Sequence, residues 1–373
     1  MKRRTKWNHS QFSSMAGIFL LITAMSPAVF AIQEPVKPIE STMAFELLML
    51  EAGVRTLPPD AVKLFQEAIT DATEAALRTN RHPQTRADAL AVLEAIQLAL
   101  VKHNFLQPAN RTDWPDTIGI AFTPRKWTPA ALGQASSFGS LPFIDRTKPY
   151  YYVDCDMGAE LVMAVGQRLG WDMRLVEIPE HNFVRWHLSD SIKVNWDWTH
   201  WASLDDSRYR AVIGSVEDVR LRELYLRSFE FKEARSYYLG LIASKADKPM
   251  DAERLFQEAV AVLPHHPLTL NNFAWLYATR AEFNKQKLKT AVAVAYGLGA
   301  WSMQPNDGNI ADTVACALVA NGSNVLAAEV EQFASDHASS REQADTFKAK
   351  KEQIAKGVLC VPDSPPSLVS DKP

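Results

Sequence analysis

The sequence predicts an α+β fold in which a few strands interrupt a mostly helical chain. Between residues 32 and 108, apolar residues recur at three- and four-residue spacing, the period of a helix that buries one face. Between residues 173 and 198, apolar and polar residues alternate, as in half-buried strands. From residue 239 onward, helical segments with small residues and closing prolines recur. We therefore expect a helical lead-in, a small sheet and a set of paired helices.

The composition is that of a folded protein without a strong charge. The 373 residues are 47% hydrophobic and include 10 Trp, 17 Phe and 9 Tyr, which suffices for a large core. Forty basic residues stand against 43 acidic ones, a net charge of −3, whereas nucleic-acid binders normally carry a strongly basic domain. We therefore expect no nucleic-acid partner.

The first 31 residues predict a signal peptide. Four basic residues precede an apolar run over residues 15–25 that is short for a membrane span, and cleavage is expected after Ala31. An uncleaved N-terminal anchor is the alternative. The leader holds no acidic residue, so the mature chain would carry a net charge of −7. A Gram-negative-like leader predicts a periplasmic or secreted protein without a transmembrane span.

Turn signals divide the rest of the N-terminal half. Residues 57–60 (LPPD) and 80–83 (NRHP) combine proline with capping-type residues, which predicts three helices within residues 32–108. Residues 108–150 contain six prolines and no sustained periodicity. We expect this segment to be a connecting loop region that covers other apolar structure.

A helix followed by three strands is predicted after residue 150. Cys155 opens an apolar-periodic segment that ends at Gly170, and glycine is the residue that helix C-termini favour. Alternation then predicts strands over residues 173–178, 181–188 and 192–198.

Cys155, His181 and Asp197 form the candidate catalytic site. A helix N-terminus favours a thiolate, and a nucleophilic cysteine needs a base together with a group that orients this base. Pairing of the second and third strands would bring His181, at the start of one, beside Asp197, near the end of the other. Asn195 shares the strand face of Asp197 and is the competing orienting residue.

Residues 154–158 (DCDMG), 179–185 (PEHNFVR) and 194–198 (VNWDW), with the lead-in 98–106 (LALVKHNFL), resemble the transglutaminase-like superfamily. The similarity is greatest to its bacterial branch in which tetratricopeptide repeats follow the core. The resemblance implies a papain-related core with Cys155 as nucleophile, His181 as general base and acid, and Asp197 as orienting residue. Members include peptidases, amidases, deamidases, cross-linking enzymes and inactive descendants.

The acidic neighbours of Cys155 depart from the family pattern. Asp154 and Asp156 flank the thiol, and negative charge there opposes thiolate formation unless both carboxylates are engaged elsewhere. An active site would have to turn them away from the sulfur, whereas an inactive one has no such need.

Paired helices are predicted over residues 206–340. Leu239-Gly240 and the closing Pro264 fit one tetratricopeptide-like unit, and the next closes at Pro305 after an insertion around residues 280–289. A third unit is predicted over residues 312–328. Such repeats commonly hold a protein or peptide partner on a concave face.

The remaining cysteines have no catalytic assignment, and the histidines form no predicted metal site. Cys316 lies on an apolar helix face and is interpreted as a core residue. Cys360 lies in residues 341–373, a predicted charged helix and flexible tail, where a disulfide to another chain is left open. The spacings of His181, His187 and His200 with Cys155 match no compact zinc-ligand pair, so no metal and no cofactor are predicted.

The sequence thus predicts an exported transglutaminase-like thiol enzyme, a cysteine hydrolase or acyltransferase acting on amide bonds, whose repeats bind a protein partner. The alternative is a catalytically inactive scaffold whose repeats mediate protein–protein interaction. The expected divisions are a signal peptide, a helical lead-in, a transglutaminase-like core, helical repeats and a charged helix with a tail, at 1–31, 32–108, 109–205, 206–340 and 341–373.

Overall fold

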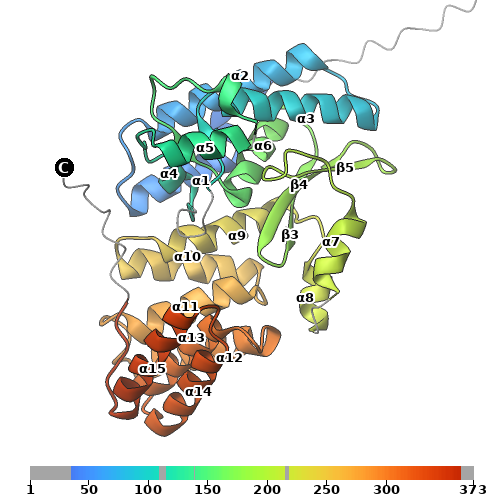
Figure 1. Cartoon of the computed structure of the whole chain (residues 1–373). Coiled ribbons are helices and arrows are strands. Elements are labelled where there is room, and N and C mark those ends of the chain that lie inside the picture. Colours follow the sequence, from blue (N-terminus) through green and yellow to red (C-terminus); the bar gives the residue numbers. More distant parts are fainter. Residues whose placement is uncertain (1–34, 109–114, 138, 215–217, 363–373) are drawn as a thin grey trace, which may run out of the picture. The chain divides into compact units, whose positions relative to one another are not determined.

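The computed structural model describes residues 35–108, 115–137, 139–214 and 218–362 (Figure 1). The predicted signal peptide lies outside the described residues. The described chain is mostly helical with a three-stranded and a two-stranded sheet, which confirms the predicted α+β class. In these ranges none of the helices has the length and apolar character needed to cross a bilayer.

Three helices form the N-terminal lead-in, as predicted. They are α1 (Met43–Val54), α2 (Ala61–Thr79) and α3 (Arg86–Val101), preceded by the short 3₁₀ helix η1 (Ile39–Ser41). A capping box starts α3, because the Thr85 side chain accepts from the backbone N–H of Asp88 while the Asp88 carboxylate accepts from that of Thr85. The proline-containing turns predicted between the helices are where the helices end.

The segment expected to be a connecting loop region contains short elements. The parallel strands β1 (Phe105–Leu106) and β2 (Tyr151–Tyr152) pair across it. Between them lie α4 (Ile118–Ala121), α5 (Pro129–Ser137) and η3 (Leu141–Phe143). The loop prediction is therefore wrong for these stretches, because elements of three to nine residues are too short to show periodicity.

A central helix and an antiparallel sheet follow. The helix is α6 (Cys155–Leu169), and Gly170 closes it with a φ of 70°, as predicted. The strands β3 (Met173–Ile178), β4 (His181–His187) and β5 (Lys193–Trp196) pair in chain order. Helix α6 packs against β3 and β4 on one side and α1, α2 and α3 on the other (Figure 1), so residues around most of its circumference are buried.

In the sequence, two short helices follow the sheet and precede the paired helices. These are α7 (Asp206–Ile213) and α8 (Val219–Leu224). Tyr209 of α7 stacks on Phe183 of β4, with ring centroids 4.3 Å apart. The chain after residue 205, predicted to be entirely helical repeats, therefore begins with helices that cover the sheet.

Paired helices make up the C-terminal half. Where the helix Phe231–Ser244 crosses the helix Pro267–Thr279, a Cβ on Gly240 would lie 2.8 Å from Thr269 Oγ1. The small residue predicted at this position therefore lets these two helices approach closely. The predicted insertion corresponds to a connection between residues 279 and 287. The helices are α9 (Phe231–Ser244), α10 (Pro249–Val262), α11 (Pro267–Thr279), α12 (Lys287–Met303), α13 (Gly308–Ala320), α14 (Asn324–Asp336) and α15 (Arg341–Ala355).

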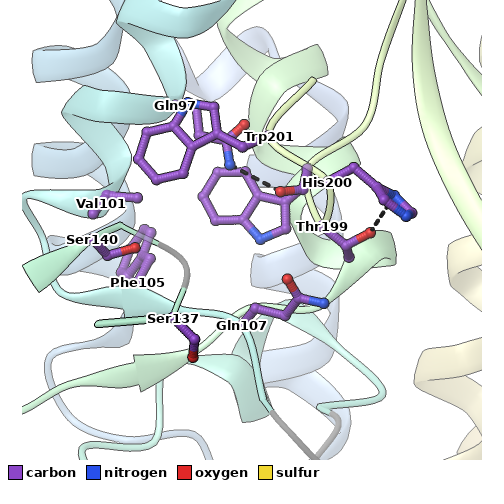
Figure 2. Close-up of a pocket in the computed structure, with 10 residues that line it drawn as sticks. Gln97, Val101, Phe105, Gln107, Ser137, Ser140, Thr199, His200 and Trp201 are labelled. Carbon is purple, nitrogen blue, oxygen red and sulfur yellow. Dashed lines mark hydrogen bonds between the residues drawn. The ribbon is translucent and has the colours of Figure 1, made fainter. Parts of the chain in front are cut away.

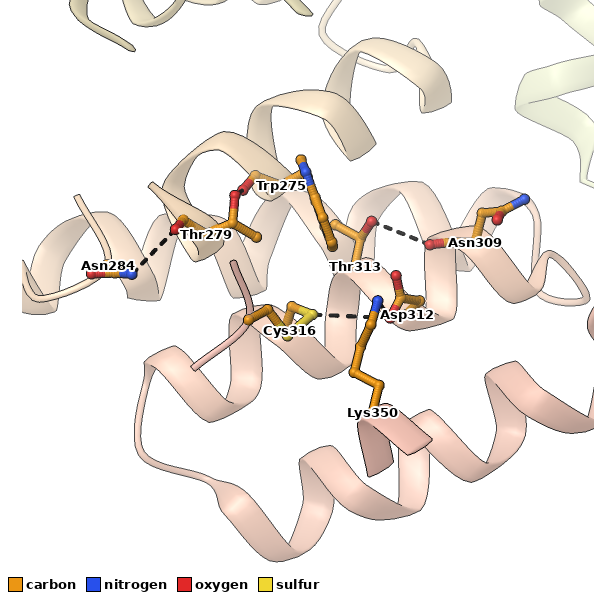
Figure 3. The surroundings of a disulfide bond; sticks show 9 residues. Trp275, Thr279, Asn284, Asn309, Asp312, Thr313, Cys316 and Lys350 are labelled. Carbon is orange, nitrogen blue, oxygen red and sulfur yellow. Dashed lines mark hydrogen bonds and ion pairs between the residues drawn. A yellow bond between two sulfur atoms is a disulfide. The ribbon is translucent and has the colours of Figure 1, made fainter. Parts of the chain in front are cut away.

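A disulfide joins Cys316 of α13 to Cys360, beyond α15, with the Cα atoms 5.6 Å apart (Figure 3). Cys316 is buried, as its apolar helix face predicts, but it is bonded rather than free. Cys360 is 7% exposed, so the prediction that it lies in a flexible tail is wrong. The polar composition of this segment indicated a flexible tail because the segment has little apolar surface of its own. The cross-link to Cys316, 44 residues away, nevertheless holds it in place.

Candidate functional site

Cys155 is the first residue of α6 and the only free cysteine. Its side chain is buried, and a hydrogen bond runs from its Sγ to Asp156 Oδ1 over 3.9 Å. Burial raises the pKa of the thiol well above its usual range, and the charges of Asp156 and Asp154 raise it further. These effects oppose the thiolate that the helix start was expected to favour.

The two acidic neighbours are engaged by other groups. Asp154 is the N-cap of α6, and its carboxylate accepts the backbone N–H of Met157 over 3.1 Å. Asp156 accepts hydrogen bonds from Asn182 Nδ2 and from Tyr237 Oη, the latter over 3.2 Å. Burial raises the pKa of both carboxyl groups, which favours their neutral forms and lessens their repulsion of a thiolate.

His181 and Asp197 are in direct contact. His181 opens β4, and its Nε2 lies 2.6 Å from Oδ2 of Asp197, which directly follows β5. Asp197 is fully buried, and although burial opposes ionisation, the hydrogen bonds from His181 and Thr199 lower the pKa of its carboxyl group. The predicted pairing of this histidine with this aspartate is confirmed.

Asn195, the competing orienting residue, does not contact His181. Its Oδ1 accepts Arg185 Nε over 2.8 Å, and its Nδ2 donates to Leu204 and Asp206. Asn195 and Asp197 share one face of the sheet, as expected, because they contact Asp206 and Tyr209 of the same helix, α7. The strand register places Asn195 opposite Arg185, whereas Asp197 reaches His181.

Cys155 and His181 line one cavity of about 400 Å³. Among the described residues no hydrogen bond joins the side chains of Cys155 and His181. The sulfur is hydrogen-bonded to Asp156, and the imidazole is hydrogen-bonded to Asp197. Because Nε2 of His181 is the nitrogen that contacts Asp197, Nδ1 is the one left for another group. The cavity is walled by the β3–β4 turn and by α11 and the α13 start, and its described lining includes no lysine or arginine.

A larger cavity of about 790 Å³ adjoins this one. The two share five lining residues, which are Glu180, Tyr225, Gln304, Asp307 and Asn309. The two cavities therefore lie side by side between the β3–β4 turn and the paired helices.

A separate cavity of about 190 Å³ lies beside the turn after β5, and neither Cys155 nor His181 lines it (Figure 2). In its wall, Gln97 Nε2 donates to the carbonyl of Trp198 over 2.9 Å, which ties the turn to α3.

Three tyrosines that the sequence did not single out contact the site. Tyr237 and Tyr238 of α9 donate to Asp156, the first to its carboxylate and the second to its backbone carbonyl over 2.9 Å. Tyr209 donates to Asp197 Oδ2 over 2.9 Å. The sequence shows these tyrosines only as aromatic residues on predicted helices, a pattern that is more typical of core packing than of a functional site.

Comparison with protein-family models, curated proteins and solved structures finds no match to this chain.

Proposed function

We propose that the protein is an exported thiol enzyme with a transglutaminase-like core that acts on amide bonds. The observation that carries this proposal is the 2.6 Å contact between His181 Nε2 and Asp197 Oδ2 at a cavity that Cys155 also lines. A nucleophile and a base at one cavity, with a buried carboxylate orienting the base, are the parts that acyl transfer requires. A helix that begins with the nucleophile and leads into three antiparallel strands is also what the resemblance implies.

The raised thiol pKa determines how the reaction would begin. His181 Nδ1 removes the proton from Cys155 as the sulfur attacks the substrate carbonyl, and Asp197 stabilises the imidazolium that forms. A backbone N–H at the start of α6 stabilises the oxyanion. The C–N bond breaks, the amine leaves with the proton from His181, and a thioester remains. Water or an amine then attacks the thioester and restores the thiol.

The disulfide supports the exported part of the proposal. Disulfides persist in oxidising compartments and are rare in reducing ones, and Cys316 and Cys360 are at bonding distance within one chain. A periplasmic or secreted location agrees with the predicted signal peptide. The two adjacent cavities between the sheet and the repeats are where a protein or peptide substrate would lie.

The second candidate is a scaffold without catalysis. One observation favours it: the Cys155 thiol is hydrogen-bonded to Asp156 rather than to the imidazole of His181. Burial and the acidic neighbours also raise the pKa of this thiol. In that case the repeats would carry the function by binding a protein.

Alkylation by iodoacetamide at neutral pH separates the two candidates. Only Cys155 labels, because the other cysteines are bonded to each other. If His181 is the base, His181→Ala slows labelling at least about tenfold. His187→Ala is the matched control, since this histidine lies at the other end of β4 and bonds Ser228. A labelling rate that is unchanged in His181→Ala would refute the enzyme and support the scaffold.

A further inference from the structure

Two imidazoles and one carboxylate converge beside the proposed catalytic pair. His200 Nδ1 lies 2.9 Å from Asp197 Oδ2, the same oxygen that His181 Nε2 contacts at 2.6 Å. The three atoms all lie within 4.8 Å of one another. One carboxylate oxygen thus faces a ring nitrogen from each of two histidines.

The backbone holds these ligands in place. Asp197 Oδ1 accepts the backbone N–H groups of Thr199 and His200, over 3.0 and 3.1 Å, so one carboxylate oxygen fixes the turn while the other faces the imidazoles. The backbone of Asp197 is also paired with that of Ala202. The Thr199 hydroxyl lies 3.3 Å from His200 Nδ1 (Figure 2). His200 is therefore positioned by Asp197, with which it would share a metal ion.

We propose that His181, Asp197 and His200 bind a zinc ion. Two imidazoles with one carboxylate suit a transition metal rather than calcium or magnesium, and three protein ligands leave a fourth position for water. The His200 side chain is 59% exposed, so an ion can reach the site from solvent. Tyr209, which donates to Asp197 Oδ2, supplies the outer hydrogen bond that orients a ligating carboxylate.

The spacing of the histidines concealed this site, for which the sequence predicted no metal. The β4–β5 hairpin brings position 181 beside position 197, and the third ligand is a carboxylate rather than a cysteine. Zinc on His181 Nε2 displaces the hydrogen bond between that nitrogen and Asp197. The zinc-bound form and the catalytic pair are thus alternative states of the same side chains, although zinc binding itself requires no thiol and holds whether or not the protein is an enzyme.

Calorimetric titration of the chelator-treated protein with Zn²⁺ tests the proposal. We expect one ion per chain, and in His200→Asn an affinity lower by at least the ~10-fold that loss of even an outer-shell partner costs. His82→Asn, at an exposed histidine on a different turn, is the matched control and binds zinc like the parent. Circular dichroism checks that each variant is folded.

Titration with Co²⁺ identifies the ligands independently of variants. Visible d–d bands without a sulfur-to-metal charge-transfer band are expected, and Cys155→Ala should leave them unchanged. An affinity unchanged in His200→Asn, or binding lost in Cys155→Ala, would overturn the proposal and, in the second case, assign the ion to the group of Asp154, Cys155 and Asp156. The alkylation assay contains no metal, so failure here leaves the proposed enzyme function untouched.

Discussion

Gly158 permits the closest approach between α6 and the turn that carries Asp197. A Cβ at this position would lie 2.2 Å from Cγ of Trp198 and 2.5 Å from its Cδ2, whereas ordinary contact begins at 3.4 Å. Gly158→Ala therefore requires a local separation of more than an ångström. The indole has little freedom to yield, because its Nε1 donates to the Val153 carbonyl over 3.0 Å.

The expected cost follows from two opposing effects. Overpacking a tight contact costs about 1–3 kcal/mol. Replacing a glycine inside a helix by alanine gains about 0.5–1 kcal/mol. Because the Cβ would overlap the indole so closely, the cost falls in the upper half of the first range, and we expect Gly158→Ala to lower the free energy of unfolding by about 1–2.5 kcal/mol. Because Asp197 precedes Trp198, the same movement should also slow alkylation of Cys155.

Urea unfolding followed by tryptophan fluorescence measures this effect. Gly53→Ala is the matched control, because Gly53 also lies in a helix but a Cβ there meets nothing within 4 Å. This control should leave stability unchanged or raise it by at most about 1 kcal/mol. If the two variants shift the midpoint in the same direction by the same amount, the contact between Gly158 and Trp198 does not limit packing and the reasoning fails.

Three further predictions concern stability. Gln97→Leu should cost about 2–4 kcal/mol in urea unfolding, because it leaves the Trp198 carbonyl and the Trp196 indole N–H buried without their partner, and an unchanged midpoint would contradict this. Reduction of the disulfide should cost about 2–4 kcal/mol, and a melting temperature insensitive to reductant would refute it. Burial, then the charge of Asp312, raises the pKa of Glu331 to about 9. The folded state therefore binds the proton more tightly, and stability falls as pH rises from about 4.5 to 9, so the advantage of Glu331→Gln should grow by at most about 1.4 kcal/mol per pH unit. A pH-independent difference would be inconsistent with that shift.

Local patterns predicted those parts of the fold and site that depend on near neighbours in the chain. Alternation located the three strands, and Gly170 marked the end of α6 because its left-handed backbone is a local requirement. Pairing of His181 with Asp197 followed from one hairpin, which spans few residues.

Contacts between distant segments left no such signal. Tyr237 reaches Asp156 across 81 residues, and nothing in its own helix distinguishes it from a core aromatic residue. The partner of Cys360 lies 44 residues away, and the composition around it indicated a loose segment. Asn195 was a plausible partner for His181 on strand parity alone, but the register of β4 and β5 places it opposite Arg185.

The hydroxyls of Tyr237 and Tyr238 make the first repeat helix part of the environment of the nucleophile. A ligand that displaces α9 would withdraw both donors from Asp156 and change the electrostatic field at the adjacent sulfur. The repeats and the half that carries Cys155 are thus not interchangeable modules. A hybrid that replaces α9 would have to supply two hydroxyl groups at the same places, or leave the buried Asp156 without two of its hydrogen-bond donors.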